Sequence, residues 1–130
     1  MDKKQRAQMY EEYLKEEGFH PEIDKDGDVV FKTEGKIYVI IIDENDEEFF
    51  RLLFPNFWPI ESEQERAKVE RAALHATAET KVAKVFPVKD DVMASIEIFC
   101  NPPQNFKSIF KRSISALQTA VRTFATKMRE

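Results

Sequence analysis

The chain has few of the residues from which common functional sites are built. Among its 130 residues there are three glycines, two histidines and one cysteine. The glycines, Gly18, Gly27 and Gly35, stand well apart from one another. A phosphate-binding loop needs several neighbouring glycines so that backbone N–H groups can approach the ligand, and this composition therefore excludes both common nucleotide-binding loops. We expect each glycine to occupy a turn or the end of a helix.

The cysteine and apolar content also limit where the chain works. Cys100 has no second cysteine with which to form an internal disulfide, which favours a reducing compartment. No apolar run approaches the roughly 20 residues that cross a bilayer. The first residues lead into a polar helix and lack the apolar stretch of a signal peptide. These features predict a cytoplasmic protein with no membrane contact.

Residues suited to metal binding or catalysis are scarce. His75 precedes Glu79 by four positions, which places both on one side of a helix, but two ligands are too few for a metal site. The run from Glu22 to Gly27 resembles the opening of a calcium-binding loop, yet its twelfth position is Thr33, which offers no bidentate carboxylate. Cys100 ends an apolar strand pattern, where a lone thiol acts as a small hydrophobe. We expect no metal, no cofactor and no catalytic residue, hence no enzyme.

Charge is unevenly distributed along the chain. The whole sequence carries a net charge of −4, of which residues 101–130 contribute +5 and residues 1–100 contribute −9. An acidic body with a basic final segment favours pairing within the protein or between subunits over a nucleic-acid surface. Apolar residues make up 42% and there are eleven phenylalanines, which predicts a folded single domain over residues 1–130.

Apolar periodicity predicts three helices and six strands. Helices are expected over residues 4–17, 63–80 and 105–128, and strands over 19–24, 29–33, 37–42, 49–54, 82–88 and 92–100. Ser62 and Glu65 match a capping box at the start of the second helix. The resulting order is α-β-β-β-β-α-β-β-α with short connections between strands. It predicts an α+β fold in which helices pack on an antiparallel sheet.

Alternation along the strands suggests a candidate binding surface. In the last strand, Val92, Ala94, Ile96 and Ile98 share one side with Cys100, which we take as the core side. The strand over 37–42 is apolar on both faces, so we expect it to be central. If the helices leave one face open, an apolar surface for a partner is predicted at Tyr38, Ile40, Ile42, Met93 and Phe99. The alternative is that helices cover both faces and that these residues belong to the core.

A second candidate is the aromatic loop Pro55-Asn56-Phe57-Trp58-Pro59. Exposed Phe57 and Trp58 between two prolines would form a rigid anchor for a partner, since tryptophan is enriched at binding hot spots. The alternative is that the loop folds its aromatic rings over the end of the sheet and seals the core.

Several segments together resemble the YbjN-type family, whose members are described as bacterial sensory-transduction regulators. The residues that carry the resemblance are Tyr13-Leu14-Lys15-Glu16-Glu17-Gly18-Phe19, Pro21-Glu22-Ile23-Asp24, Asp28-Val29-Val30-Phe31-Lys32 and Gly35-Lys36-Ile37-Tyr38. The similarity covers about residues 10–125 and involves mainly apolar and turn positions. It implies a cytoplasmic bacterial α+β domain with a fold like that of type III secretion chaperones, often dimeric and without established catalytic residues.

These observations lead to two functional hypotheses. The preferred one is a non-enzymatic binding module, chaperone-like or regulatory, that holds a polypeptide partner on an apolar surface and forms a homodimer. The alternative is a regulatory domain that senses a small molecule in a cavity between the last helix and the sheet, lined by Phe and Tyr side chains. Neither hypothesis includes nucleic acid or membrane as a partner.

Overall fold

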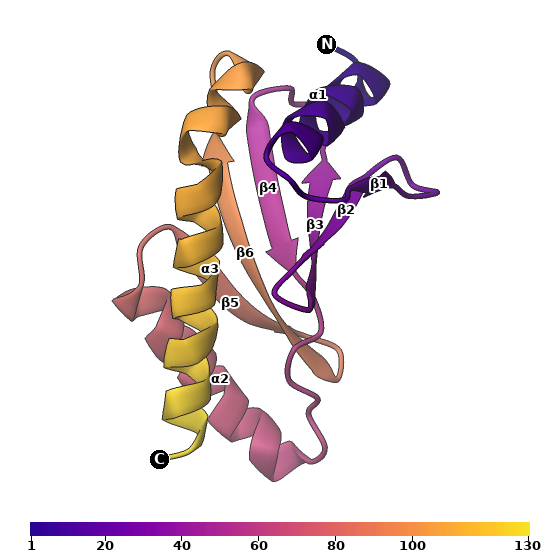
Figure 1. Ribbon diagram of the computed structural model, residues 1–130. Helices are drawn as coiled ribbons and strands as arrows, with labels where there is room; N and C mark the ends of the chain where they lie inside the picture. Colours follow the sequence, from indigo (N-terminus) through magenta and orange to yellow (C-terminus); the bar gives the residue numbers. More distant parts are fainter. The chain divides into compact units, whose positions relative to one another are not determined.

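The computed structural model describes all 130 residues (Figure 1). The elements are α1 (Lys3–Glu16), β1 (Glu22–Ile23), β2 (Val29–Thr33), β3 (Lys36–Ile42), β4 (Phe49–Phe54), α2 (Glu63–Glu79), β5 (Ala83–Val88), β6 (Asp91–Phe99), the short 3-10 helix η1 (Pro103–Asn105) and α3 (Phe106–Met128). The strands form one antiparallel sheet in the order β1-β2-β3-β4-β6-β5. This arrangement confirms the α+β class and the order of elements expected from the sequence.

Internal contacts divide the chain into two compact units. Unit 1 consists of Met1–Leu53 and Glu97–Phe110, and unit 2 consists of Phe54–Ile96 and Lys111–Glu130. β6 and α3 each contribute residues to both units. Neither unit is a continuous stretch of chain, and the single domain expected from the sequence stays a prediction.

Local interactions fix the ends of α1 and the turns of unit 1. Asp2 and Gln5 form a capping box, in which the Asp2 carboxylate accepts a hydrogen bond from the Gln5 N–H at 2.8 Å and the Gln5 side chain accepts one from the Asp2 N–H at 2.9 Å. Gly18 follows the helix with φ of +90°, and Gly27 and Gly35 have φ of +83° and +76°. A side chain adopts this left-handed backbone only at a cost, so the three turns explain the three glycines as expected.

An aromatic core joins α1 and the start of α3 to one face of β2, β3 and β4. The Phe110 ring lies 5.7 Å from that of Phe31, between ring centres, and the Phe106 ring lies 4.7 Å from Tyr10 and 5.8 Å from Phe50. All five side chains are at most 2% exposed. Contacts of this kind add about 0.5–1.5 kcal/mol per ring pair to the gain from burial.

Three of the residues predicted to bind a partner belong to this core. Tyr38, Ile40 and Ile42 are only 1%, 0% and 4% exposed. In the strand register Tyr38 lies opposite Phe31 of β2, and Ile40 lies opposite Leu52 of β4, so they share the face that the helices cover. These side chains therefore form part of the core and not of an exposed surface, which corrects the expectation from the sequence.

Arg6 of α1 is buried in unit 1 although it is charged. It is 1% exposed, and its guanidinium donates hydrogen bonds to the carbonyl oxygens of Asp43 at 2.6 Å and Phe49 at 2.9 Å. These two carbonyls lie at the two ends of the loop between β3 and β4. Arg6 thus fastens this loop to α1 through backbone oxygens, without a carboxylate partner.

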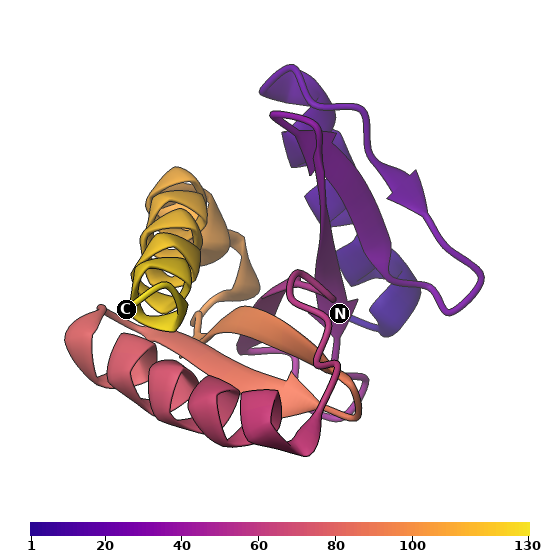
Figure 2. The same ribbon diagram turned by 90° about the horizontal axis from the view of Figure 1, so that it is seen from below.

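In unit 2, α2 runs alongside the edge strand β5 (Figure 2). Ser62 caps this helix by accepting a hydrogen bond from the Glu65 N–H at 3.0 Å. The Glu65 carboxylate accepts from the Glu61 N–H at 3.3 Å, so the reciprocal bond of the expected capping box falls one residue earlier. The Thr77 hydroxyl accepts from the Val85 N–H at 2.9 Å and donates to the Val85 carbonyl at 3.3 Å. α2 thereby satisfies polar groups on the free edge of the sheet.

Truncation of Phe110 tests the aromatic core of unit 1. We expect Phe110→Ala to lower the free energy of unfolding by about 3–5 kcal/mol, because the side chain is fully buried among aromatic rings. Phe99→Ala is the matched control, since the Phe99 side chain is 72% exposed, and its effect should stay within about 0.5 kcal/mol. Urea denaturation followed by circular dichroism measures both. Equal losses for the two variants would contradict this description of the core.

Candidate functional site

The second face of the unit 1 sheet carries an apolar surface that no helix of unit 1 covers. Its exposed and half-buried members are Val30, Ile37, Val39, Ile41, Phe49, Arg51, Glu97 and Phe99, which we call the outer face, whereas Leu53, opposite Val39 on the same side, is only 7% exposed. They alternate along the strands with the buried residues that contact α1 and α3. Phe99 is 72% exposed and Ile37 is 46% exposed, while the other six are half-buried. The outer face is thus the main exposed apolar feature of unit 1.

An ion pair lies beside the exposed ring of Phe99. The rings of Phe99 and Phe49 are 6.1 Å apart between their centres. Arg51 and Glu97 lie two residues along the strands from Phe49 and Phe99, respectively. The Arg51 Nε atom lies 3.7 Å from Glu97 Oε2, a separation too long for a hydrogen bond. The two side chains are 33% and 15% exposed, respectively. The aromatic pair therefore borders a partly buried pair of opposite charges.

Of the other residues predicted to bind a partner, Phe99 is exposed as expected and Met93 is not. Met93 alternates with the core residues of β6 in the same way as Phe99, but it belongs to unit 2. It is half-buried and lies opposite Phe86 of β5. On the other side of the strand, Val92, Ala94, Ile96 and Cys100 are buried as predicted from the sequence, whereas Ile98 is half-buried. Ser95, which alternates with these residues, is also 0% exposed, so this part of β6 is buried on both sides.

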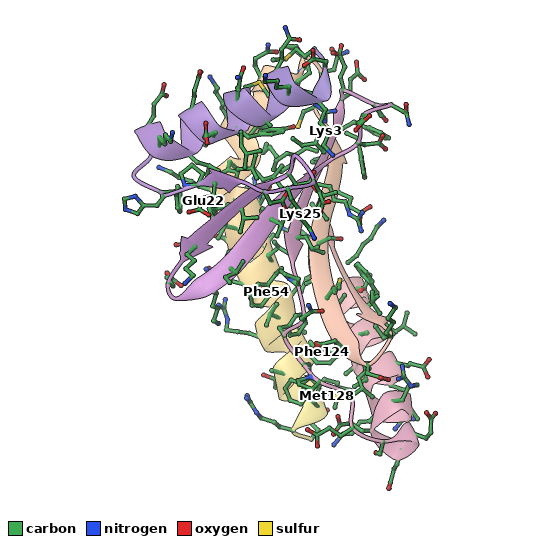
Figure 3. The ribbon with its side chains drawn as sticks, turned by 90° about the vertical axis from the view of Figure 1, so that its right-hand side faces the viewer. Lys3, Glu22, Lys25, Phe54, Phe124 and Met128 are labelled. Carbon is green, nitrogen blue, oxygen red and sulfur yellow. The ribbon has the colours of Figure 1, made fainter.

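The aromatic loop packs against α3 in unit 2. The ring of Phe124 lies 5.6 Å from Phe57 and 5.4 Å from Trp58, and Phe57 stacks on Phe54 at 5.4 Å, all between ring centres. Figure 3 labels Phe54 and Phe124 in this part of the molecule. The Phe57 N–H also donates to the carbonyl of Val92 at 3.0 Å, which fixes the loop backbone. Both loop side chains are half-buried. This is the alternative weighed from the sequence, in which the loop closes the core.

Sequence reasoning missed Ile37, Val39, Ile41 and Phe49 as outer-face residues, since both sides of β3 are apolar. The residues opposite β3 on the neighbouring strands show which of its sides faces outward. Ile37 and Ile41 lie opposite the charged residues Lys32 and Arg51, whereas Tyr38 lies opposite the apolar Phe31. Only the strand register shows this difference, and the register is set by the fold.

The two motifs considered as metal sites, the run from Glu22 to Gly27 and the pair of His75 and Glu79, have local structural roles. The Asp24 carboxylate accepts hydrogen bonds from the N–H groups of Asp26 at 2.9 Å and Asp28 at 3.0 Å and so closes its own turn. His75 borders a shallow groove of about 360 Å³ between α2 and α3, which also holds Lys127. Lys127 pairs with Glu130 at 3.0 Å. No three histidine, cysteine or acidic side chains gather as a metal site would require.

The pKa values of Tyr10, Cys100 and Glu47 are shifted, and packing or a local ion pair explains each of these shifts. Burial raises the pKa of Tyr10 and that of the Cys100 thiol. The N-terminal ammonium group donates a hydrogen bond to Glu47 at 2.6 Å and lowers the pKa of that carboxyl group.

No protein-family model matches this chain, and no curated protein matches it either. None of the helices is both long enough and apolar enough to cross a bilayer.

The buried thiol next to Phe99 gives a direct test of local packing. Cys100 is 5% exposed and its pKa is raised by burial, so its reactive thiolate forms at higher pH in the folded than in the unfolded chain. We expect iodoacetamide to label the folded protein at least about tenfold more slowly than the protein in urea at the same pH. The rate–pH profile should also be displaced to higher pH. Identical profiles in the two states would show that the end of β6 is not packed as described.

Proposed function

We propose that this protein is a non-enzymatic binding module, chaperone-like or regulatory, that holds a polypeptide segment on the outer face. The observation that carries the proposal is the 72% exposure of Phe99 beside Phe49, on a face that continues through Ile41 and Val39 to Ile37. Contiguous exposed apolar side chains rimmed by polar residues are typical of protein-interaction sites, and aromatic residues commonly dominate their affinity.

The edges of the sheet favour binding on a face over strand addition. The edge strand β1 has only two residues, Glu22–Ile23, and follows Pro21, which lacks a backbone N–H. At the other edge, Thr77 already bonds both polar backbone groups of Val85. A partner that added a strand would find few free backbone groups at either edge. Side-chain contact with the outer face is the better-supported mode.

The alternative hypothesis of a small-molecule cavity has less support. It places the ligand between the last helix and the sheet. In unit 1 that space holds the rings of Phe31, Phe50, Phe106 and Phe110, which are in direct contact and at most 1% exposed. Because these packed rings fill the space between helix and sheet, the exposed outer face is the better candidate for a binding site.

The proposal includes three further expectations from the sequence. The protein works in the cytoplasm, consistent with its single buried cysteine, Cys100. It belongs to the YbjN-type family, which rests on the resemblance of the segments between Tyr13 and Tyr38. It forms a homodimer, as that resemblance implies. The absence of catalysis is part of the same proposal.

Peptide binding provides the test of this function. The probe is a fluorescein-labelled synthetic peptide of about ten residues that alternates Leu or Phe with Ser, because alternate side chains of an extended segment point to one face. We expect fluorescence anisotropy to show binding, and Phe99→Ser to weaken it by about tenfold or more, equivalent to about 1.4 kcal/mol.

Leu74→Ser is the matched control for the peptide experiment. Leu74 lies on α2 in unit 2 and is 73% exposed, so it has the same exposure as Phe99 on an unrelated surface. Its replacement should leave peptide affinity unchanged. Absence of binding, or equal losses for the two variants, would reject the outer face as the binding site.

A further inference from the structure

We propose that the outer face takes a basic amphipathic segment, in which Lys or Arg residues alternate with large apolar ones. This inference rests on the proposed function and names the chemistry of the partner. It follows from the charges of unit 1 and from the position of one acidic loop beside the exposed aromatic ring.

The two units carry opposite net charges. Unit 1 has nine Lys or Arg residues and sixteen Asp or Glu residues, a net charge of −7. Unit 2 has eleven and eight, respectively, a net charge of +3. Because the outer face belongs to unit 1, the field around it attracts cations and repels anions such as phosphate groups.

The acidic loop between β3 and β4 lies at the Phe99 end of the outer face. It runs Asp43-Glu44-Asn45-Asp46-Glu47-Glu48 and leads directly into Phe49, whose ring contacts Phe99. The Cys100 N–H donates to the Glu48 carbonyl at 2.6 Å, which fixes the chain after Phe99 to this loop. The most exposed apolar side chain of unit 1 is therefore bordered by a loop with five carboxylates.

Much of the charge on this loop is not neutralised within the protein. Asp43, Asp46 and Glu48 form no ion pair, whereas Glu44 lies 4.0 Å from Lys3 and Glu47 pairs with the N-terminal ammonium. The buried Arg6 bonds backbone carbonyls of the loop region and no carboxylate. Asp43 and Asp46 each accept one backbone hydrogen bond inside the loop, at 2.9 Å and 3.1 Å, but these bonds leave their negative charges without a cation to attract.

The cations of the outer face do not cancel this field at the Phe99 end. Arg51 is paired with Glu97 at 3.7 Å, and Lys32 lies opposite Ile37, at the β2–β3 turn end of its strand. A bound extended segment would direct its apolar side chains to Phe99 and Phe49 and every second side chain away from the face. Lys or Arg at those second positions would lie within a Debye length, about 10 Å at 0.1 M salt, of the acidic loop.

Three peptides that differ only in charge test the inference on the full chain. They share the Leu and Phe positions and carry Ser, Lys or Glu at the alternating positions. We expect the Lys peptide to bind about tenfold more tightly than the Glu peptide at about 0.05 M salt, and the difference to vanish near 1 M salt.

A charge-neutralising double variant assigns the effect to the loop. Asp43→Asn with Glu48→Gln removes two charges and keeps an oxygen acceptor at each position, including the one that bonds the Asn45 N–H. We expect it to weaken the Lys peptide by about threefold and to leave the Ser peptide unchanged. Glu70→Gln with Glu79→Gln, both exposed on α2, is the matched control and should change neither peptide.

The outcomes separate this inference from the proposed function. Equal affinities for the three peptides, with binding still lost in Phe99→Ser, would overturn the basic partner and leave the binding module in place. Tighter binding of the Glu peptide would also overturn the inference. Failure of all three peptides to bind would overturn both.

Discussion

The fold of unit 1 depends on one constraint, which is that both of its helical segments pack on the same face of the sheet. Tyr10 of α1 and Phe106 of α3 meet at 4.7 Å between ring centres, and both contact Phe50 of β4. Because α1 and the start of α3 are joined by these rings, neither is available to the opposite face. The exposure of Phe99 and Ile37 follows from this arrangement.

The outer face is also bordered by charge, which comes from the acidic loop between β3 and β4. Arg6 is buried, and its guanidinium donates hydrogen bonds to the backbone carbonyls of Asp43 and Phe49 and to no carboxylate. The loop is held in place by Arg6, while Glu44 and Glu47 lie beside local cations and Asp43, Asp46 and Glu48 form no ion pair. Packing and charge thus combine at one end of the outer face, where the exposed ring of Phe99 lies beside the acidic loop. This combination distinguishes Phe99 from an isolated exposed apolar side chain.

Much of the fold could be predicted from the sequence because local patterns determine it. The bounds of β2 and β4 match the expected 29–33 and 49–54, and the apolar stripe of α3 places Phe106, Phe110 and Phe124 in the core. Which side of the sheet forms the outer face could not be predicted, because β3 is apolar on both sides. Only the pairing of Ile37 with Lys32 and of Ile41 with Arg51 distinguishes the two sides. The burial of Arg6 was equally inaccessible, because arginine is rarely buried and its partners here are backbone atoms distant in sequence.

We propose that a polypeptide docks on the outer face of unit 1. Amide chemical-shift mapping with the Lys peptide tests it most directly, because it locates the contact without relying on any variant. If the peptide binds there, we expect the shifts to concentrate in β3, in β4 and around Phe99. Shifts confined to the Phe57–Trp58 loop, or to α2 and the second half of α3, would contradict it.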